Sequence, residues 1–407
     1  MRRLAWGKLA AERAPASLAA AALAVNRETA MQIARFETEH FFAHYEFNTP
    51  WQLCNSDCES ITIADLLELA GDSLEAFGAQ RLGYTQSQGQ PELRAAIAGL
   101  YGRVRPDDVV VLGAPVEGIC LAAHALSDPG DEAIVLSPGY DALLNLVRHV
   151  AGPERVRRWT FRASGERWEL DLDELRRLIT PRTRLLVLNF PHNPTGYLPS
   201  PDFQRELAAI VEQHGLWLFS DEMYFGLVHS GTPPLPSAAD TVERSVVLSG
   251  LSKTHGLPGL RCGWLIVRDA SLRDTLMNWK YYTSICPPAP SEYLAAAALR
   301  VHERLRRRSV DRIEKNLSLA AAFFTRWPER FRWRPPLAGS TALVGVAVPS
   351  VSELAHTLAR EEGILIQSAQ TLGGDDQHMR IGLGREGFGA ALDRFDAWLQ
   401  RGRLARP

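Results

Sequence analysis

The sequence of 407 residues has few cysteines, no excess of basic charge and no long apolar run. Its five cysteines are an odd number without a repeated spacing, which argues against a disulfide framework. Forty-five Lys and Arg against 47 Asp and Glu give a formal net charge of −2, so the charge does not indicate nucleic acid or an anionic membrane as partner. No stretch reaches the roughly 18 apolar residues of a transmembrane helix. We therefore expect a soluble, cytoplasmic protein.

Two segments resemble special sites without meeting their requirements. Cys54 and Cys58 have a spacing suited to half a metal site, but no second pair or His-x-His follows, and structural zinc takes four ligands. We expect no metal and interpret both cysteines as small residues in a loop. The Ala-rich Pro15–Val25 follows Arg2 and Arg3 as in a signal peptide, but it is weakly apolar, which favours an amphipathic helix.

The sequence does contain a regular alternation of short apolar runs and helical segments between about residues 105 and 267. The apolar runs are Val109–Leu112, Glu132–Ser137, Val156–Thr160, Arg184–Asn189, Leu216–Ser220, Ser245–Ser249 and Cys262–Val267. The helical patterns between them are Val116–Leu126, Tyr140–Val150, Asp171–Ile179 and Pro201–His214. Such alternation predicts a mostly parallel sheet with helices on both faces.

The gap before the last apolar run differs from the others. Between Ser245–Ser249 and Cys262–Val267 lie only about a dozen residues, among them Gly256, Pro258 and Gly259. A parallel crossover normally contains a helix, and Pro and Gly disfavour a helix in this gap. We therefore expect the last strand to run antiparallel, in a mixed sheet of about seven strands.

The pattern changes after residue 270. Ser291–Val301 and the Arg-rich Val301–Leu317 predict long helices, and the apolar runs Thr341–Val348 and Gly363–Gln367 precede a terminal helix at Gly387–Leu399. This indicates a smaller α+β domain, which the first 70 residues are expected to join because they lack the βα alternation. We thus predict an N-terminal segment at residues 1–70, a large domain at residues 71–295 and a small C-terminal domain at residues 296–407.

Polar residues follow four of the predicted strands, at the edge where open α/β sheets bind ligands. The four segments are Gly113–Gly118, Asn189–Gly196, Asp221–Tyr224 and Gly250–Arg261. Taken alone, each has an ordinary structural interpretation, such as a turn, a helix cap or a surface lysine. Their joint position at four strand ends predicts a site that combines a phosphate-type loop with an amide, a carboxylate, a tyrosine, a lysine and an arginine.

These segments resemble the class I/II aminotransferase family of pyridoxal-5′-phosphate (PLP) enzymes. The signature elements are Asn193-Pro-Thr-Gly196, Asp221-x-x-Tyr224 and Ser252-Lys253 followed by Arg261. The resemblance, over about residues 80–385, implies an α/β fold of the fold type I PLP-dependent transferases: a mixed, mostly parallel seven-stranded sheet flanked by helices, plus a smaller α+β domain. It implies a PLP-dependent aminotransferase whose small-molecule substrates are an L-amino acid and a keto acid.

Three residues carry the chemistry that the resemblance implies. Lys253 would hold PLP as an internal imine, which requires a neutral amine and a lowered pKa, and would then move the Cα proton. Asp221 would face the pyridine nitrogen, where a carboxylate favours the protonated ring and makes it a better electron sink. Tyr140, in Ser137-Pro-Gly-Tyr140, matches the aromatic residue that stacks on the ring.

The remaining cofactor contacts follow from the same resemblance. Asn193 and Tyr224 would bind the phenolic oxygen of the ring, and Asn193 would also contact the substrate. The phosphate would lie at the helix start formed by Ala114, Pro115 and Val116, since helix N-termini bind anions. Pro115 has no backbone N–H, so its neighbours must supply the missing donor.

Four further residues complete the implied site. Ser252 and Arg261 would add a hydroxyl and a guanidinium to the phosphate. Tyr84 resembles the tyrosine that family members donate to the phosphate of the neighbouring subunit, which implies a homodimer with shared active sites. Arg380, in His378-Met-Arg-Ile-Gly382, matches the arginine that grips the substrate α-carboxylate.

The outcome after Cα proton loss stays open, because racemisation, elimination, cyclisation and oxidation use the same residues as transamination. Leu53–Ser60 and Phe190–Asn193 are loosely similar to a side branch of arginine-processing PLP enzymes that includes capreomycidine synthase. Asp57 or Glu59 could there pair with a guanidinium group, or Asp57 could cap a helix that begins near Ile63. A cyclase, oxidase or eliminase acting on arginine or an arginine derivative is therefore the alternative function.

Overall fold

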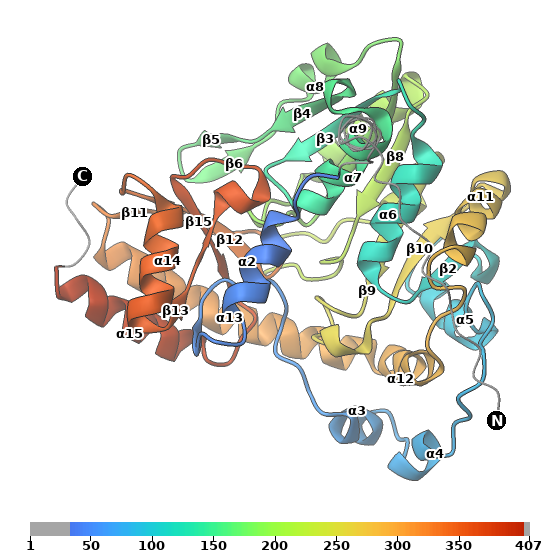
Figure 1. Cartoon of the computed structure of the whole chain (residues 1–407), viewed down its shortest axis with the longest axis horizontal. Coiled ribbons are helices and arrows are strands. Elements are labelled where there is room, and N and C mark those ends of the chain that lie inside the picture. Colours follow the sequence, from blue (N-terminus) through green and yellow to red (C-terminus); the bar gives the residue numbers. More distant parts are fainter. Residues whose placement is uncertain (1–32, 403–407) are drawn as a thin grey trace, which may run out of the picture. The chain divides into compact units, whose positions relative to one another are not determined.

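The largest sheet of the structure, a computed structural model that describes residues 33–402, has seven strands (Figure 1). The strands are β2 (Val109–Leu112), β3 (Glu132–Ser137), β4 (Val156–Thr160), β7 (Thr183–Asn189), β8 (Trp217–Asp221), β9 (Ser245–Gly250) and β10 (Gly263–Val267). They lie in the order β2-β10-β9-β8-β7-β3-β4. Neighbours are parallel except where β10 pairs with β9 and with β2. The predicted mixed sheet with an antiparallel last strand is therefore confirmed.

Helices cover both faces of this sheet because alternate residues of each strand point to opposite sides. The helices are α5 (Pro91–Ala98), α6 (Pro115–Leu126), α7 (Asp141–Ala151), α8 (Leu172–Leu178), α9 (Pro201–Gln213), α10 (Ala238–Thr241), α11 (Ala270–Tyr281) and α12 (Ala289–Arg300). Val110 and Leu112 of β2 belong to the core that α6, α7 and α11 cover. Val109 and Val111 belong to the second core, under α5, α8, α9 and α12. The predicted fold class is confirmed.

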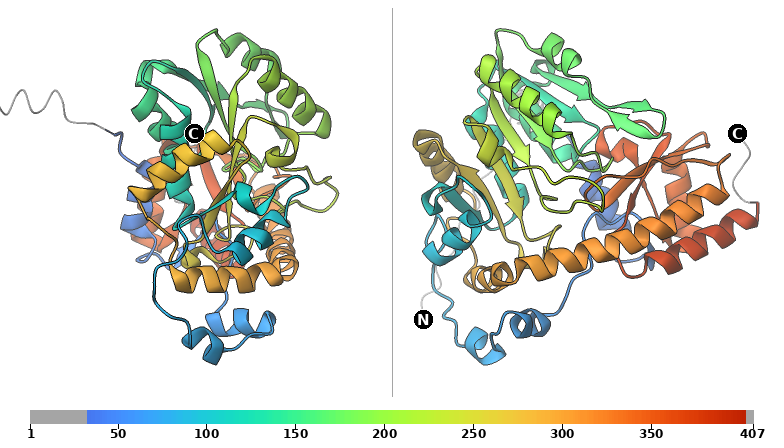
Figure 2. Two further views of the ribbon diagram at one scale, coloured as in Figure 1. Left: turned by 90° about the vertical axis from the view of Figure 1, so that its right-hand side faces the viewer. Right: turned by 180° about the vertical axis from the view of Figure 1, so that it is seen from behind.

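A smaller antiparallel sheet forms the second part of the fold. Its strands are β11 (Phe331–Arg332), β12 (Thr341–Val346), β15 (His378–Gly382) and β14 (Gln367–Ser368), in this order. The helices α13 (His302–Arg326), α14 (Val351–Glu362) and α15 (Phe388–Gln400) lie beside it, and α13 runs from α12 to α15 (Figure 2). The hairpin of β5 (Arg162–Ser164) and β6 (Arg167–Glu169) was not predicted.

Two sequence expectations need correction, and two remain untested. The Arg-rich helix is longer than Val301–Leu317, since α13 continues to Arg326. The expected strand Gly363–Gln367 divides into two short strands, β13 (Ile364–Leu365) and β14, which pair with different partners. The helix expected at Pro15–Val25 lies outside the described residues. From Arg35 onward the chain forms one compact unit, and its division at residues 70 and 295 stays a prediction.

The segment at residues 51–60, here called the strap, lies against the small sheet. Its start forms β1 (Trp51–Gln52), which pairs in parallel with β13. The Gly382 N–H then donates to the Leu53 carbonyl at 2.7 Å, and the Glu59 N–H donates to the Gly384 carbonyl at 2.9 Å. A Cβ at Gly382 would overlap the Asn55 carbonyl oxygen, so the strap can approach β15 this closely only at glycine.

The helix α2 (Glu37–Tyr45) lies between the two sheets (Figure 1). The Thr38 N–H faces the Asp141 carboxylate at the start of α7 at 3.5 Å, and the Thr38 hydroxyl donates to the Thr371 carbonyl at 3.2 Å. The Tyr45 hydroxyl lies 2.6 Å from Nδ1 of His356 on α14. Contacts at both ends therefore fix α2 against the large sheet and the small one.

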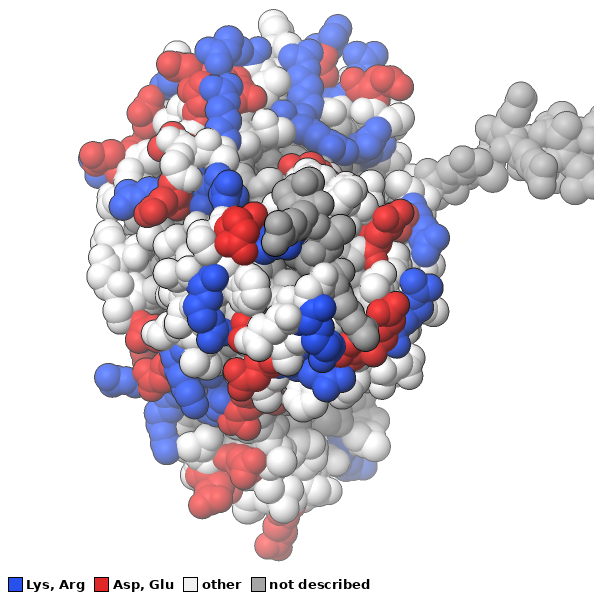
Figure 3. Space-filling view, turned by 90° about the vertical axis from the view of Figure 1, so that its left-hand side faces the viewer, with Lys and Arg blue, Asp and Glu red and all other residues white. Residues whose placement is uncertain are grey.

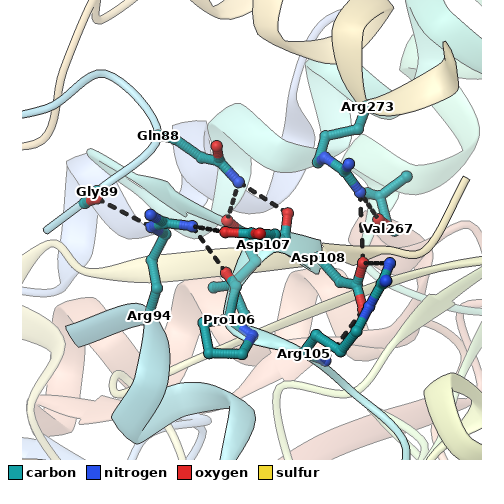
Figure 4. Close-up of polar contacts among 10 residues, drawn as sticks. Gln88, Gly89, Arg94, Arg105, Pro106, Asp107, Asp108, Val267 and Arg273 are labelled. Carbon is teal, nitrogen blue, oxygen red and sulfur yellow. Dashed lines mark hydrogen bonds and ion pairs between the residues drawn. The ribbon is translucent and has the colours of Figure 1, made fainter. Parts of the chain in front are cut away.

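Buried polar contacts anchor β2 at its start (Figure 4). The fully buried Asp108 carboxylate pairs with Arg105 at 2.9 Å and with Arg273 of α11 at 3.4 Å. Arg94 of α5 donates to the Pro106 carbonyl at 2.9 Å. A buried carboxylate needs such partners. The network fixes the strand that leads into the turn before α6.

Charges of both signs are mixed on the face shown in Figure 3, in keeping with the net charge of −2. Among residues 33–402, no helix has the length and apolar character to cross a membrane, and no cluster of three or more His, Cys, Asp or Glu has the arrangement of a metal site. The five cysteines are free, and Cys54 and Cys58 lie in irregular chain. The cytoplasmic location stays a prediction.

The contact between the strap and β15 can be tested with Gly382→Ala. The added Cβ overlaps the Asn55 carbonyl, so we expect the free energy of unfolding to fall by about 1–3 kcal/mol, as in other overpacked sites. Urea unfolding of the variant and the wild type measures the change. Gly78→Ala is the matched control, because Gly78 ends the exposed helix α4 (Leu74–Gly78) with open space around it. A Gly382→Ala protein as stable as the control would contradict the prediction.

Candidate active site

A cavity of about 560 Å³ lies at the carboxyl ends of the strands of the large sheet. The ends of β7 and β8 and the turns after β2 and β9 form one side, and α2, the strap and β15 form the other. The sequence-predicted residues that line it are Asp57, Pro115, Val116, Tyr140, Asn193, Asp221, Tyr224, Ser252, Lys253, Arg261 and Arg380. The structure thus brings together all of the predicted site residues except Ala114 and Tyr84.

Lys253 follows β9 and projects its amine into the cavity. Its Nζ donates a hydrogen bond to Oγ of Ser56 in the strap at 2.8 Å. Burial lowers the pKa of Lys253, the Asp57 carboxylate opposes this shift, and the Arg380 guanidinium adds to it. A lowered pKa increases the fraction of neutral amine, which is the form that attacks a carbonyl carbon.

Asp221 is the last residue of β8 and is buried. One carboxylate oxygen accepts from the Met223 N–H at 3.1 Å, and burial raises the pKa of Asp221 to about 6, while Lys253 lowers it. Asn189, at the end of β7, donates to the Asp221 carbonyl at 2.8 Å and accepts from the Asn193 N–H at 2.8 Å. Asn189 was not predicted, and it links Asp221 of β8 to Asn193 in the loop after β7.

Arg380 of β15 is held in a fixed orientation. Its side chain is 1% exposed, and its Nε and Nη2 donate to the Cys54 carbonyl at 3.1 and 2.9 Å. Its Nη1 donates to the Asn193 side-chain oxygen at 3.3 Å, and the guanidinium lies 5.6 Å from the centre of the Phe42 ring. The strap and the small sheet therefore place a buried cation next to an amide from the large sheet.

Two tyrosines of the cavity keep their protons. Burial raises the pKa of Tyr224, and burial together with Glu39 raises the pKa of Tyr140. The Tyr140 hydroxyl donates to Glu39 of α2 at 2.8 Å, and its ring packs edge-on against Phe36. Both phenols therefore remain hydrogen-bond donors near neutral pH.

His192 joins two of the loops that carry site residues. Its Nε2 lies 2.9 Å from the Pro138 carbonyl, which can only accept, so Nε2 carries the proton. Its Nδ1 then accepts from the Thr195 hydroxyl at 2.7 Å. Burial lowers the pKa of His192 to about 3, which keeps the ring neutral. The sequence analysis placed His192 next to Asn193 but did not predict that it would connect these two loops.

The end of the cavity at α6 has the features of an anion site. Ala114 is the N-cap of α6 without a side-chain cap, and Pro115 begins the helix. The Ser252 hydroxyl is buried and has no hydrogen-bond partner in the described part of the chain. Leaving such a group unpaired is costly, so it fits a bound oxygen such as that of a phosphate. Arg261 reaches the same cavity, with Nη1 donating to the Pro258 carbonyl at 2.9 Å.

The strap carboxylates have protein partners. Asp57 lines the cavity and forms a bidentate pair with Arg385, at 3.2 and 2.9 Å. The alternative that Asp57 caps the next helix is wrong: Thr62 caps α3 (Ile63–Leu69) by accepting from the Asp65 N–H at 3.1 Å. Glu59 is absent from the cavity lining among residues 33–402. The substrate contact expected of Asp57 stays a prediction.

Several lining residues were not predicted. They are Phe36, Thr38, Glu39, Phe42, Glu46, Asn55, Ser56, Asn189, Met223 and Pro258. The polar run Asn55-Ser56-Asp57 in the strap could have indicated Asn55 and Ser56 as site residues, since the sequence analysis had already identified Asp57 as a candidate. The α2 residues gave no local signal, because α2 reaches the cavity only through its tertiary contacts. Tyr84 lies outside the cavity with 92% of its surface exposed.

The profile of the family described as "Aminotransferase class I and II" matches residues 53–387. Capreomycidine synthase of Streptomyces vinaceus is 32% identical over 300 residues, which cover 73% of this chain and 75% of that protein. The valine–pyruvate aminotransferase of Mycobacterium tuberculosis is 33% identical over 236 residues, 55% of this chain and 58% of that protein. The chain thus aligns with little more than half of this second relative.

Solved structures give the same picture. A PLP-dependent aminotransferase from Streptococcus suis superposes with a TM-score of 0.85 at 25% identity, over 91% of this chain and 98% of that chain. The PLP-dependent cyclase OrfR superposes with a TM-score of 0.84 at 26% identity and the same coverage. Both resemblances inferred from the motifs are therefore confirmed. Because the relatives include aminotransferases and a cyclase, they leave the reaction open.

The buried carboxylate predicts a pH dependence of stability for the cofactor-free protein. The pKa of Asp221 is raised from 3.8 to about 6, so its stabilising contribution is present below about pH 4 and is lost as the pH rises to about 6. Asp221→Asn removes this titration and retains an acceptor for the Met223 N–H. Relative to wild type, the variant should therefore gain about 3 kcal/mol between pH 4 and pH 8.

Urea unfolding of both proteins across this pH range measures the difference. Asp393→Asn, an exposed change on α15, serves as the matched control. Parallel curves for the Asp221 variant and wild type would contradict the raised pKa.

Proposed function

The chain belongs to the aminotransferase class I and II family and uses PLP, and we propose that it transfers the α-amino group of an L-amino acid to a keto acid. The observation that carries the proposal is the meeting of Lys253, Asp221 and Arg380 in one cavity. They supply an amine with a lowered pKa, a buried carboxylate and a fixed guanidinium, which are the groups needed to bind PLP and to move a proton on an amino acid.

PLP, when bound, supplies an aldehyde that amines attack and a ring that withdraws electrons from the substrate Cα. We assign Asp221 to the ring nitrogen, where its carboxylate holds a proton on that atom. Asn193 and Tyr224 are assigned to the phenolic oxygen, because both are donors in the same wall. Ser252, Arg261 and the N-terminus of α6 are assigned to the phosphate, as the unpaired Ser252 hydroxyl supports.

Lys253 performs the proton transfer in this proposal. Its lowered pKa increases the fraction of Nζ that has a free lone pair, and this neutral form can take the proton from the substrate Cα. The hydrogen bond from Nζ to the Ser56 hydroxyl holds the amine at the side of the cavity that the strap forms. The protonated Nζ can then give this proton to another atom of the bound reactants, so Lys253 acts first as a base and then as an acid.

Arg380 orients the substrate in this proposal. Two of its donors are fixed by the Cys54 carbonyl, so the guanidinium pays little additional entropy when a carboxylate binds. An α-carboxylate on the Nη1 edge beside Asn193 would set the direction of the Cα–H bond relative to Lys253.

A second candidate is a cyclase, oxidase or eliminase that acts on arginine or an arginine derivative. It is supported by the 32% identity with capreomycidine synthase over 73% of this chain and by the structural likeness to the cyclase OrfR. Lys253 and Asp221 would serve both reactions, because both begin with loss of the Cα proton.

A single-turnover experiment tests the reaction. When the PLP-loaded protein is mixed with an amino donor and no acceptor, transamination should release about one keto acid per site and convert the cofactor to pyridoxamine phosphate. Absorbance and mass spectrometry of the products measure both. A cyclised amino acid with unchanged cofactor would favour the second candidate instead.

Two lysine variants control this experiment. Lys253→Ala should slow the conversion by at least about 10²- to 10⁴-fold, the usual contribution of a general acid–base group. Lys315→Ala, an exposed change on α13, should leave the rate unchanged.

We also propose a homodimer with shared active sites. Tyr84 is supported as a residue that serves a neighbouring site, because it is exposed and lies outside its own cavity; Leu82 and Tyr282 are also more than 80% exposed. Light scattering should give a mass of about 90 kDa, twice the 45.1 kDa of one chain. Tyr84→Phe should weaken PLP binding about 10-fold, as expected for one hydrogen bond to a charged group. A 45.1 kDa protein would contradict the proposal.

A further inference from the structure

The cavity contains more negative charge than the proposed chemistry uses. Four carboxylates line it, and under the proposed function Asp221 faces the ring nitrogen while Asp57 already pairs with Arg385. Glu39 and Glu46 remain, and in the described part of the chain neither forms an ion pair with Lys or Arg. The cations that line the cavity are Lys253, Arg261 and Arg380. The proposed function assigns all three to the cofactor or to the substrate α-carboxylate, so they do not neutralise Glu39 and Glu46.

The two carboxylates sit at opposite ends of α2. Glu39 accepts from the Tyr140 hydroxyl at 2.8 Å, and Glu46, directly after α2, accepts from the Asn55 side-chain NH₂ at 3.3 Å. Burial, and then the negative charge of Asp57, raise the pKa of Glu46, and the positive charges of Arg385 and Lys253 offset part of this rise. A positive group of a ligand close to Glu46 would offset both the burial and the repulsion from Asp57, since an opposite charge favours the ionised form of the carboxylate.

Asn55 provides an independent indication of a ligand. Its side chain is 3% exposed and lines the cavity. Because an ionised Glu46 can only accept, the Asn55 amide turns its NH₂ toward that carboxylate. The Oδ1 atom is then buried with no hydrogen-bond partner among residues 33–402. An unpaired buried acceptor costs about 1–3 kcal/mol unless a bound group donates to it.

We propose that Glu46, Asn55 and Glu39 form the pocket for the substrate side chain and select an amino acid whose side chain is a cation with several N–H donors, such as guanidinium or ammonium. This inference rests on the proposed function, because it requires an amino acid in the cavity. A guanidinium or ammonium group beside Glu46 can donate to the Asn55 oxygen and pair with the Glu46 carboxylate, while Glu39 adds negative charge from the other end of α2. A neutral side chain of the same length leaves buried acceptors unpaired, which is a strong ground for rejection.

In this proposal the specificity for a cationic side chain depends on Glu46 and not on Asp57. Because Arg385 already holds both oxygens of Asp57, its charge is balanced before substrate binds. Glu46 is half-buried, accepts one hydrogen bond from a neutral donor and forms no ion pair within residues 33–402, so removing its charge should affect a cationic ligand more than a neutral one.

Pairs of amino acids of similar shape, one with a cationic side-chain group and one without it, test the proposal on the PLP-loaded protein. L-Arginine is compared with its neutral analogue L-citrulline, and L-lysine with L-norleucine, by calorimetry and by the change in cofactor absorbance. The charged member of each pair should bind about 10- to 150-fold more tightly, as expected for hydrogen bonds to charged groups. The relative affinities of arginine and lysine distinguish guanidinium from ammonium.

Two variants locate the selectivity. Glu46→Gln keeps the shape and removes the charge, so it should reduce the preference for the charged member about 10-fold and leave norleucine affinity unchanged. Glu39→Gln should have a smaller effect, because Glu39 is exposed. Glu212→Gln, an exposed change on α9, should change neither affinity.

The wild-type comparison alone decides the inference if a variant fails to fold. Equal binding of charged and neutral members overturns it, and so does a Glu46→Gln protein with the full preference. If neutral or acidic amino acids bind and react while the basic pair does not, the proposed function stands and this inference fails. If no amino acid binds or alters the cofactor absorbance, the proposed function itself fails.

Discussion

The close approach of the strap to β15 is the contact on which the cavity depends. It is possible because Gly382 and Gly384 have no Cβ, and hydrogen bonds at Leu53 and Glu59 fix the strap on either side. Three successive strap residues then reach the site: the Cys54 carbonyl fixes Arg380, the Asn55 side chain contacts Glu46, and the Ser56 hydroxyl accepts from Lys253. By holding the strap, the small sheet therefore places a hydrogen-bond acceptor next to the Lys253 amine and another next to the Arg380 guanidinium.

Burial acts in opposite directions on the two central charges. It raises the pKa of Asp221 and lowers the pKa of Lys253, because each is driven toward its neutral form. Each shift increases the neutral fraction of its group inside the cavity. Partners from separate elements keep them there: Asn189 ties the end of β7 to Asp221, and Ser56 of the strap holds Lys253.

The elements that could be predicted from the sequence are those that a local pattern of residues determines. Apolar runs of strand length gave the strands of the large sheet to within a residue or two, and the Pro and Gly before Cys262 gave the direction of β10. The strand ends gave Asn193, Asp221 and Lys253 because parallel topology gathers such ends at one edge. Glu39, Glu46 and the pairing of Asp57 with Arg385 were not predictable, since they depend on how α2 and the strap pack across more than 300 residues of chain.

The same carboxylates bear on the choice between the two candidate reactions. A guanidinium group paired with carboxylates stays protonated, since its pKa lies far above neutral pH, and its nitrogens then have no lone pair for bond formation. A cyclase needs such a lone pair, and therefore a base that removes the proton at the right moment. An aminotransferase only needs to hold the side chain still. A pocket built from Glu39 and Glu46 stabilises the protonated state, which favours transamination.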